Sequence, residues 1–191
     1  MSETAVGSKR AFDFLGMNER EGKPRSRGVT EIRGTYYSAM AKRYLSEVLD
    51  TMGEYVDSLK FAGGPFTLMP DEALKRIIET AHEHDVMVSA GGFIEYVLTQ
   101  GPDAVDEYVR ACREVGFDII EISGGFISIA NDDWLRLVER VQKAVLKAKP
   151  EAGIQFGAGG DTDAGELQVE GTRDPEWMIS RPGASSTRGP T

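Results

Sequence analysis

The chain has little of what secreted, membrane-spanning or nucleic-acid-binding proteins depend on. Among its 191 residues there is one cysteine, so no intrachain disulfide can form, and this favours a reducing compartment. No apolar run approaches the roughly 18 residues that a membrane-spanning helix needs. The net charge of −9 argues against broad nucleic-acid binding, because a phosphate backbone attracts basic surfaces, but it does not forbid a small anionic ligand. We therefore predict a cytoplasmic protein that binds neither membrane nor nucleic acid.

Both ends of the chain are polar and lack periodicity. Residues 1–27 are rich in Ser, Gly, Lys, Glu and Arg, and the first ten lack the apolar core of a secretory signal. Residues 180–191 are mostly Pro, Gly, Ser, Thr and Arg. We predict a disordered leader over 1–27, a folded domain over 28–179 and a disordered tail over 180–191.

Between these ends, strand and helix patterns alternate. Strands are predicted at 29–33, 55–61, 86–90, 117–122 and 148–156, and helices at 38–52, 70–81, 93–98, 102–116 and 131–145. Alternation of this kind indicates an α/β fold with a parallel sheet and right-handed crossovers, with about five βα units visible. The single cysteine, Cys112, falls on the apolar face of a predicted helix, so we expect it to be a core residue.

A glycine pair ends three of the predicted strands, each time after a polar or charged residue. The pairs are Gly63-Gly64, Gly91-Gly92 and Gly124-Gly125. Glycine at a strand end permits a sharp turn and the close approach of a ligand. In α/β folds, the carboxyl ends of the strands are where chemistry is found. The pairs therefore predict an architecture and a surface for a site, although a purely steric need for tight turns explains them equally well.

Several stretches resemble the phosphosulfolactate synthase family over residues 27–179. They are Leu59-Lys60-Phe61-Ala62-Gly63-Gly64, Ala81-His82-Glu83-His84, the Gly91-Gly92 turn with Glu95, the run from Gly116 to Ser123, and Lys149-Pro150-Glu151-Ala152-Gly153. The sequence of residues 153–162 resembles that of the fungal and plant branch of the family, which includes heat-stress-associated relatives, more than that of the archaeal synthases. The resemblance implies a (β/α)8 barrel, which would be C-terminally truncated here, with about five or six βα units present.

The resemblance also implies a reaction. Members of this family are lyases that add sulfite to phosphoenolpyruvate with Mg²⁺, an early step of coenzyme M biosynthesis. The addition builds negative charge on the carboxylate in an enolate-like intermediate, which a metal ion held by carboxylates can stabilise. A general acid must then protonate carbon. This chain departs from the family pattern in two ways. It has 191 residues and reaches about five or six βα units, whereas a whole barrel has eight and typically takes about 250 residues. The archaeal members also carry lysines where this chain has Ile154 and Gln155.

Charged residues inside apolar strands are the candidates for this chemistry. We predict catalytic roles for Lys60, Glu121 and Lys149, and Mg²⁺ ligation by Glu121 and Glu151, because hard cations prefer carboxylate oxygen. Each has a structural alternative. Lys60 could be a lysine whose side chain extends to solvent at the rim of the barrel. Glu121 could be a buried carboxylate that is paired with Lys or Arg, and Lys149 could face inward and be that partner. Glu151 could be a solvated acid in a loop.

A second group is predicted to bind the small anionic substrate. Arg33 could hold a phosphate or carboxylate by a bidentate contact, or form a surface salt bridge instead. Serine hydroxyls and glycine N–H groups at the strand ends could donate further hydrogen bonds. The predicted substrate-binding residues are Arg33, Gly63, Gly64, Ser89, Gly91, Gly92 and Ser123.

Other interpretations stay open at this point. The chain could be a non-catalytic relative that is stress-associated or binds a partner, or an inactive truncated product. Five or six βα units would leave unpaired strand edges, which predicts poor monomer stability and a homo-oligomer. The alternative fold is an open, flavodoxin-like sheet, which needs only about five strands.

Overall fold

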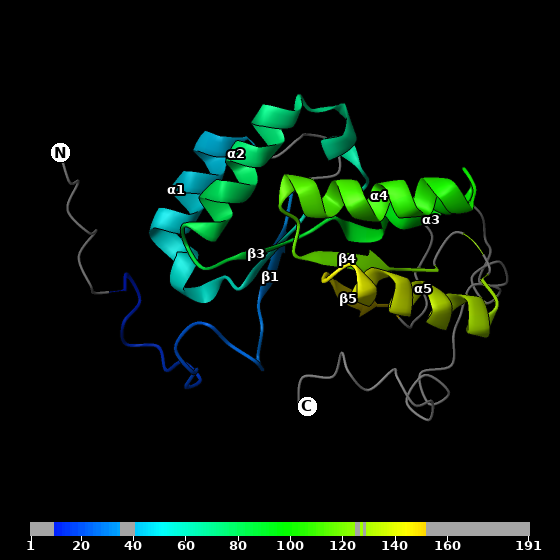
Figure 1. The fold of residues 1–191 in the computed structure, drawn as a ribbon. Helices are drawn as coiled ribbons and strands as arrows, with labels where there is room; N and C mark the ends of the chain where they lie inside the picture. The colour runs from blue at the N-terminus through cyan, green and yellow to red at the C-terminus, as the bar shows by residue number, and fades with distance from the viewer. Residues whose placement is uncertain (1–9, 35–40, 125–126, 128, 152–191) are drawn as a thin grey trace, which may run out of the picture.

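A computed structural model describes residues 10–34, 41–124, 127 and 129–151, and all structural statements below concern these residues. Strands and helices alternate along the chain, with α1 beside α2 and α3 beside α4 (Figure 1). The strands are β1 (Glu31–Arg33), β2 (Ser58–Lys60), β3 (Met87–Ser89), β4 (Ile119–Ile122) and β5 (Lys147–Pro150). The helices are α1 (Lys42–Met52), α2 (Asp71–His82), α3 (Ile94–Leu98), α4 (Pro102–Val115) and α5 (Asn131–Lys143), with short 3₁₀ turns at Gly53–Tyr55, Pro65–Leu68 and Gly91–Phe93.

The five strands form one parallel sheet in the order in which they occur along the chain, β1-β2-β3-β4-β5. This confirms the predicted α/β class. A sequential order is that of a barrel, whereas a flavodoxin-like sheet reverses direction after its first strands. The strands are shorter than predicted, since the predicted strands at 29–33 and 55–61 contain only Glu31–Arg33 and Ser58–Lys60. Residues 38–40 and 152–156 of the predicted elements lie outside the described residues.

The two faces of the sheet differ sharply in polarity. Side chains alternate between faces along a strand. Those that pack against the helices are apolar and buried, among them Leu59, Val88, Ile120 and Ala148. The alternate positions are mostly polar or charged, with Met87 and Ile119 as the apolar exceptions. The polar and charged ones are Glu31 and Arg33 on β1, Ser58 and Lys60 on β2, Ser89 on β3, Glu121 on β4, and Lys147 and Lys149 on β5. The face away from the helices therefore carries the candidate chemistry.

An ion pair between the first and last strands shows that the sheet is strongly curved. Lys149 Nζ on β5 lies 2.7 Å from Glu31 Oε1 on β1. In a flat sheet, strands four places apart would be separated by about 19 Å, far beyond the combined reach of these side chains. The polar face is consequently concave, as in the wall of a barrel. The fold is thus of the (β/α)8-barrel type. The described residues contain five strands, of which the first four are followed by a helix, and β1 and β5 each have one neighbouring strand there.

The helices bury regularly spaced apolar side chains against the convex face. In α4 these are Val105, Val109 and Cys112, so the predicted core position of the cysteine is confirmed. Helix α4 ends at Gly116, whose φ of +104° favours glycine. In α5, Trp134, Leu137, Val138 and Val141 are buried. No helix of the described part of the chain is both long and apolar enough to cross a bilayer.

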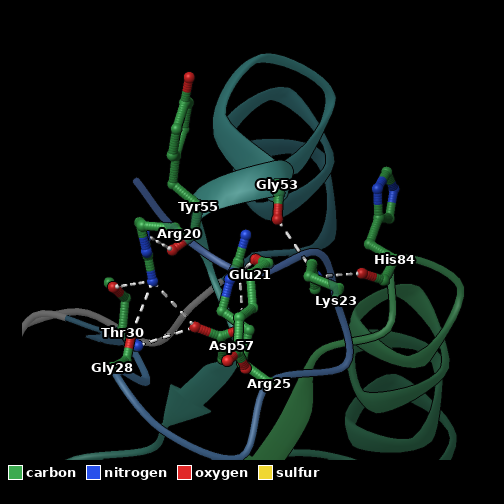
Figure 2. A network of polar contacts seen from close by, with 10 residues as sticks. All are labelled: Arg20, Glu21, Lys23, Arg25, Gly28, Thr30, Gly53, Tyr55, Asp57 and His84. Atoms are coloured by element: carbon green, nitrogen blue, oxygen red, sulfur yellow. Dashed lines mark hydrogen bonds and ion pairs between the residues drawn. The ribbon is translucent and has the colours of Figure 1, made fainter. Parts of the chain in front are cut away.

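Residues 20–25, which we call the amino-end clasp, lie against the amino ends of the strands. Arg25 Nη1 is 2.9 Å from Asp57 Oδ1, and both side chains are only 4% exposed. Arg20 donates to Asp57 Oδ2 at 3.3 Å, and the Thr30 N–H donates to the same oxygen at 2.8 Å. Lys23 donates to the carbonyl oxygens of Gly53 (3.1 Å) and His84 (2.6 Å), as Figure 2 shows.

These contacts differ from the expectation of a disordered leader over 1–27. The physical reason is that each of Arg20, Lys23 and Arg25 has a partner that lies 30 or more residues further along the chain. Composition, which suggested disorder, carries no information about such distant partners. The boundaries proposed for the leader, the domain and the tail stay predictions, and residues 152–191 lie outside the described residues.

Candidate functional site

Five charged side chains meet on the concave face of the sheet, and we call them the charged cluster. They come from different strands: Glu31 from β1, Lys60 from β2, Glu121 from β4, Lys149 from β5 and Glu151 just beyond β5. Three of the strand residues, Lys60, Glu121 and Lys149, had been predicted as catalytic. The parallel pairing and the curvature of the sheet bring residues up to 118 positions apart into contact.

Glu121 is the centre of the charged cluster. Its side chain is 0% exposed, and it forms ion pairs with both lysines. Lys149 lies directly opposite it on the neighbouring strand, with Nζ 3.0 Å from Glu121 Oε1. Lys60 reaches the carboxylate from two strands away, across the small, fully buried Ser89 that pairs with it in register. A buried carboxylate is stable only with such partners.

Each lysine also contacts a second acid. Lys60 Nζ is 3.4 Å from Glu151 Oε1, and Lys149 Nζ is 2.7 Å from Glu31 Oε1. Glu31 in turn accepts a hydrogen bond of 3.1 Å from the Ser58 hydroxyl. Glu31 is not among the site residues predicted from the sequence. Its spacing of two from Arg33, which places both on one face of the strand, is the signal that could have identified it.

The ionisation of the charged cluster follows from these contacts. Burial raises the pKa of Glu151 from its ordinary 4.5 to about 7, helped by the hydrogen bond and negative charge of Glu121. Burial alone would also raise the pKa of Glu121, but hydrogen bonds from Glu151 and Lys60 and the charges of both lysines outweigh it and lower that pKa. For Lys60 and Lys149 the carboxylates outweigh burial, so both pKa values are raised. At neutral pH the lysines and Glu121 are charged, while Glu151 is near its midpoint.

The glycine pairs have a packing role at the same edge. A Cβ on Gly64 would lie 2.2 Å from the Phe93 ring, and one on Gly91 would lie 2.3 Å from the Phe61 carbonyl oxygen. Both residues also have positive φ, +78° and +62°. A Cβ on Gly92 would lie 2.5 Å from Ser123 Oγ. Close packing is therefore sufficient to require glycine here, and anion binding by Gly63, Gly64, Gly91 and Gly92 stays a prediction.

The two predicted serines are buried beside the charged cluster. The Ser89 hydroxyl accepts a hydrogen bond of 3.2 Å from the Gly91 N–H. The Ser123 hydroxyl donates to Glu95 Oε1, and the other oxygen of this buried carboxylate accepts the Ile127 N–H at 3.1 Å. Both serines thus hold the strand-end turns in place. Their contact with substrate stays a prediction.

Arg33 is the last residue of β1, in register with Lys60, and it lines a hollow of about 330 Å³ between β1 and α1 with Ile32, Tyr44, Leu45 and Val48. Its predicted contact with a phosphate or carboxylate is untested.

The carboxylates of the charged cluster do not fit a divalent cation in this arrangement. Within the described residues, no group of three or more His, Cys, Asp or Glu side chains is placed to hold a metal ion. Glu121, the predicted Mg²⁺ ligand, has two ammonium groups against its carboxylate. A divalent cation about 4 Å from one ammonium would be repelled by about 8 kcal/mol at an effective dielectric constant of about 20. The ligation of Mg²⁺ by Glu121 and Glu151 therefore stays a prediction of the family resemblance alone.

Comparison with known proteins identifies the family. Residues 18–189 match the family model described as (2R)-phospho-3-sulfolactate synthase (ComA). The chain belongs to this family. The match extends beyond residues 27–179, over which the sequence analysis had noted the resemblance, and it confirms that expectation.

The relatives favour the plant-type branch, as predicted. The chain is 41% identical over 138 residues to the protein HEAT-STRESS-ASSOCIATED 32 of Arabidopsis thaliana, covering 72% of this chain and 48% of that protein. It is 33% identical over 129 residues to the phosphosulfolactate synthase of Methanothermobacter thermautotrophicus, covering 68% and 48%. The phosphosulfolactate synthase of Bacillus subtilis is 31% identical over 124 residues, covering 63% and 46%. The chain spans about half the length of these relatives.

Among solved structures, an N-acetylneuraminate lyase from Mycoplasma synoviae is weakly similar. It has a TM-score of 0.39 and 18% sequence identity, covering 66% of this chain and 45% of that chain. The fold assignment rests on the strand order, the sheet curvature and the family match, and not on this similarity.

Proposed function

We propose that the charged cluster is the reaction centre of a phosphosulfolactate-synthase-like lyase, which adds sulfite to phosphoenolpyruvate. The observation that supports this most is the buried Glu121 carboxylate held between the Lys60 and Lys149 ammonium groups at the carboxyl ends of parallel strands. In barrel enzymes this edge of the sheet carries the catalytic residues. The reaction is that of the named relatives, and each of them is about twice as long as the part that this chain matches.

The proposed reaction needs charge stabilisation and a proton. The sulfur lone pair of sulfite forms a bond to C3 of phosphoenolpyruvate, and the π electrons of the C2–C3 bond move into the carboxylate. The enolate-like intermediate is then protonated at C2, so that no oxidant, reductant or leaving group is required. Fixed cations beside the carboxylate lower the energy of the intermediate, and a neutral acid beside C2 supplies the proton.

The residues of the charged cluster have properties suited to these tasks. The Lys60 and Lys149 ammonium groups are held in place by Glu121 and are partly exposed on the concave face. Glu151 has a pKa of about 7 because of burial and the neighbouring Glu121, so it can hold a proton at neutral pH. We assign it as the proton donor. Mg²⁺, which the family resemblance implies, would supply a Lewis acid, but no step is assigned to it here.

The test is sulfite-dependent loss of phosphoenolpyruvate, measured with excess Mg²⁺ and with EDTA. We expect Lys60→Met and Glu121→Gln to lower kcat/KM by about 10²- to 10³-fold, because each removes or releases a fixed charge. Lys147→Met is the matched control, since Lys147 lies on the same strand as Lys149 but contacts the Met87 sulfur and not the charged cluster. Absence of turnover in the unmodified chain, or full activity in both cluster variants, would exclude this function.

A non-catalytic, partner-binding role is the second candidate. The observation that favours it is the higher identity to the plant heat-stress-associated protein, 41%, than to the phosphosulfolactate synthases, 24–33%. In that case the charged cluster is a structural network, and a partner should be recovered whether or not it is intact. Equal recovery of one partner by the unmodified chain and by Lys60→Met, with no turnover by either, would favour this candidate.

A further inference from the structure

In the charged cluster, lysine ammonium groups occupy the positions next to the carboxylates where a metal ion would have to bind. Lys60 and Lys149 approach Glu121 from opposite sides, one across β3 and one from the adjacent strand. Each of the other two acids is also in contact with a lysine, Glu151 with Lys60 and Glu31 with Lys149. Three carboxylates are thus shared between two ammonium groups, and the formal charge is nearly balanced. Magnesium sites instead use one or two carboxylates together with substrate phosphates.

The lysines are arranged to bind a further anion. An ammonium group has three N–H donors. In the described residues, Lys60 forms ion pairs with Glu121 and Glu151, and Lys149 forms ion pairs with Glu31 and Glu121, so each ammonium group faces two carboxylates and has a third N–H donor. Both side chains are partly exposed, at 18% and 40%, while the carboxylate between them is fully buried. A ligand arriving from the concave side therefore meets two ammonium groups and not the Glu121 carboxylate, and the Glu31 and Glu151 carboxylates beside them are partly exposed as well.

We infer that Lys60 and Lys149 take the place of a divalent cation in this chain, so that a small carboxylate- or phosphate-bearing ligand binds to this pair without metal. Glu121 is then a positioning residue, which holds the two ammonium groups at a fixed separation. This inference rests on the proposed function for the location of the ligand, but it departs from the metal dependence that the family resemblance implies.

Two measurements on the purified chain test it. The first follows Mn²⁺, a substitute for Mg²⁺ that also prefers carboxylate oxygen, by the electron paramagnetic resonance signal of the free ion. We expect no Mn²⁺ bound at the charged cluster, so that Glu121→Gln and Glu151→Gln change nothing in the titration. The double variant Lys60→Met/Lys149→Met, which leaves three uncompensated carboxylates, is expected to gain Mn²⁺ binding.

The second measurement is calorimetric titration with phosphoenolpyruvate. The dissociation constant should agree within about twofold between excess Mg²⁺ and EDTA, and it should rise about tenfold or more in Lys149→Met but not in Lys147→Met. The pair Lys147 and Lys149 makes a matched comparison, because both lie on β5 with side chains on the same face.

The outcomes separate this inference from the proposed function. Mn²⁺ bound by the unmodified chain and lost in either glutamine variant would overturn it, as would phosphoenolpyruvate binding only in the presence of metal, or not at all. Metal-independent binding without sulfite-dependent turnover would support the lysine pair and exclude the synthase reaction. If Glu121→Gln does not fold, Glu151→Gln alone decides the Mn²⁺ titration. The Glu151 side chain is 30% exposed, so a substitution there should destabilise the fold less.

Discussion

At the scale of single residues, Glu121 and its two lysines form one energetic unit. A carboxylate with 0% exposure depends on both partners, and removing one leaves charge uncompensated in the interior. Replacing both members of such a pair is less damaging than breaking it. The sequence alone could not distinguish a catalytic Lys60 from a lysine reaching the rim, because both interpretations place the same residue at the same strand end.

A double-mutant cycle measures this coupling. Lys60→Met should lower the free energy of unfolding by about 3 kcal/mol, because Glu121 loses one of its two ammonium partners. The double variant Lys60→Met/Glu121→Gln should recover part of that loss. Urea denaturation of the four proteins gives the coupling energy, and additive effects would show that the two residues do not interact.

Glu151 predicts a pH dependence of stability. Its pKa is about 7 in the folded chain, because of burial and the neighbouring Glu121, against an ordinary 4.5. The folded state therefore favours the protonated form, and this stabilisation is complete below about pH 4.5 and is lost as the pH rises through 7. Glu151→Gln, which stays neutral, should match the parent chain in acid and exceed its stability by about 1 kcal/mol at pH 8, after allowing for solvent screening. A pH-independent difference between the two would contradict the assignment.

At the scale of elements, the amino-end clasp joins β1, β2 and the turns after α1 and α2. Its central acid, Asp57, accepts from Arg20, Arg25 and the Thr30 N–H, while Lys23 bonds to the turn carbonyl oxygens (Figure 2). A leader with this composition was expected to be disordered. Its contacts depend on a buried aspartate at the start of a strand, which composition does not reveal.

Asp57→Asn should destabilise the fold by about 3 kcal/mol, because it leaves the buried Arg25 guanidinium without its charged partner. The control is Arg27→Met, which removes an exposed pair with Glu21, whose side chains are 62% and 53% exposed. Arg27→Met should change the free energy of unfolding by no more than about 0.5 kcal/mol. Thermal or urea unfolding gives both values, and equal effects would show that the clasp does not support the sheet.

The strand-end turns give a second prediction at this scale. Gly91 and Gly28 have nearly equal φ, +62° and +61°, but a Cβ would lie 2.3 Å from the Phe61 carbonyl oxygen at Gly91 and would meet nothing within 4 Å at Gly28. Gly28→Ala should lower the free energy of unfolding by only about 1–2 kcal/mol, the strain of placing a side chain at a positive φ. Gly91→Ala should cost clearly more, because a backbone atom must also move. Similar unfolding free energies for the two variants would mean that close packing is not what requires glycine at position 91.

At the scale of the whole molecule, alternation of strand and helix patterns was enough to predict the α/β class and the five parallel strands. Lys60 and Glu121 stood out because charge is unusual inside apolar strands, and Lys149 because it lies in the Lys149-Pro150-Glu151 stretch that resembles the family and could pair with an acid. Glu31 was not, because its contact with Lys149 exists only when the first and last strands curve toward each other. Curvature is a property of the whole sheet, so no local pattern reports it. The ion pairs of Glu121 with Lys60 and Lys149, which disfavour a metal, depend instead on the register of β2, β3, β4 and β5.

The two edge strands of the described sheet predict self-association. In the described residues β1 and β5 each pair on one side only, and unpaired parallel edges can recruit other chains. We expect the average mass measured by sedimentation to rise with protein concentration. A monodisperse monomer with a sharp, cooperative melt over the same concentrations would contradict this.

The ion pair between Lys149 and Glu31 has a consequence for the order of folding. Its two residues are 118 positions apart, and Lys60 and Glu151 are 91 apart, so these contacts close most of the described chain. Contacts at such separation are costly to form before nearer ones exist. We therefore expect the charged cluster to form late in folding, because it needs β1, β2, β4 and β5 to be in place together. A protein in which this sheet is only partly paired would lack the site, although every residue of the site is present in its sequence.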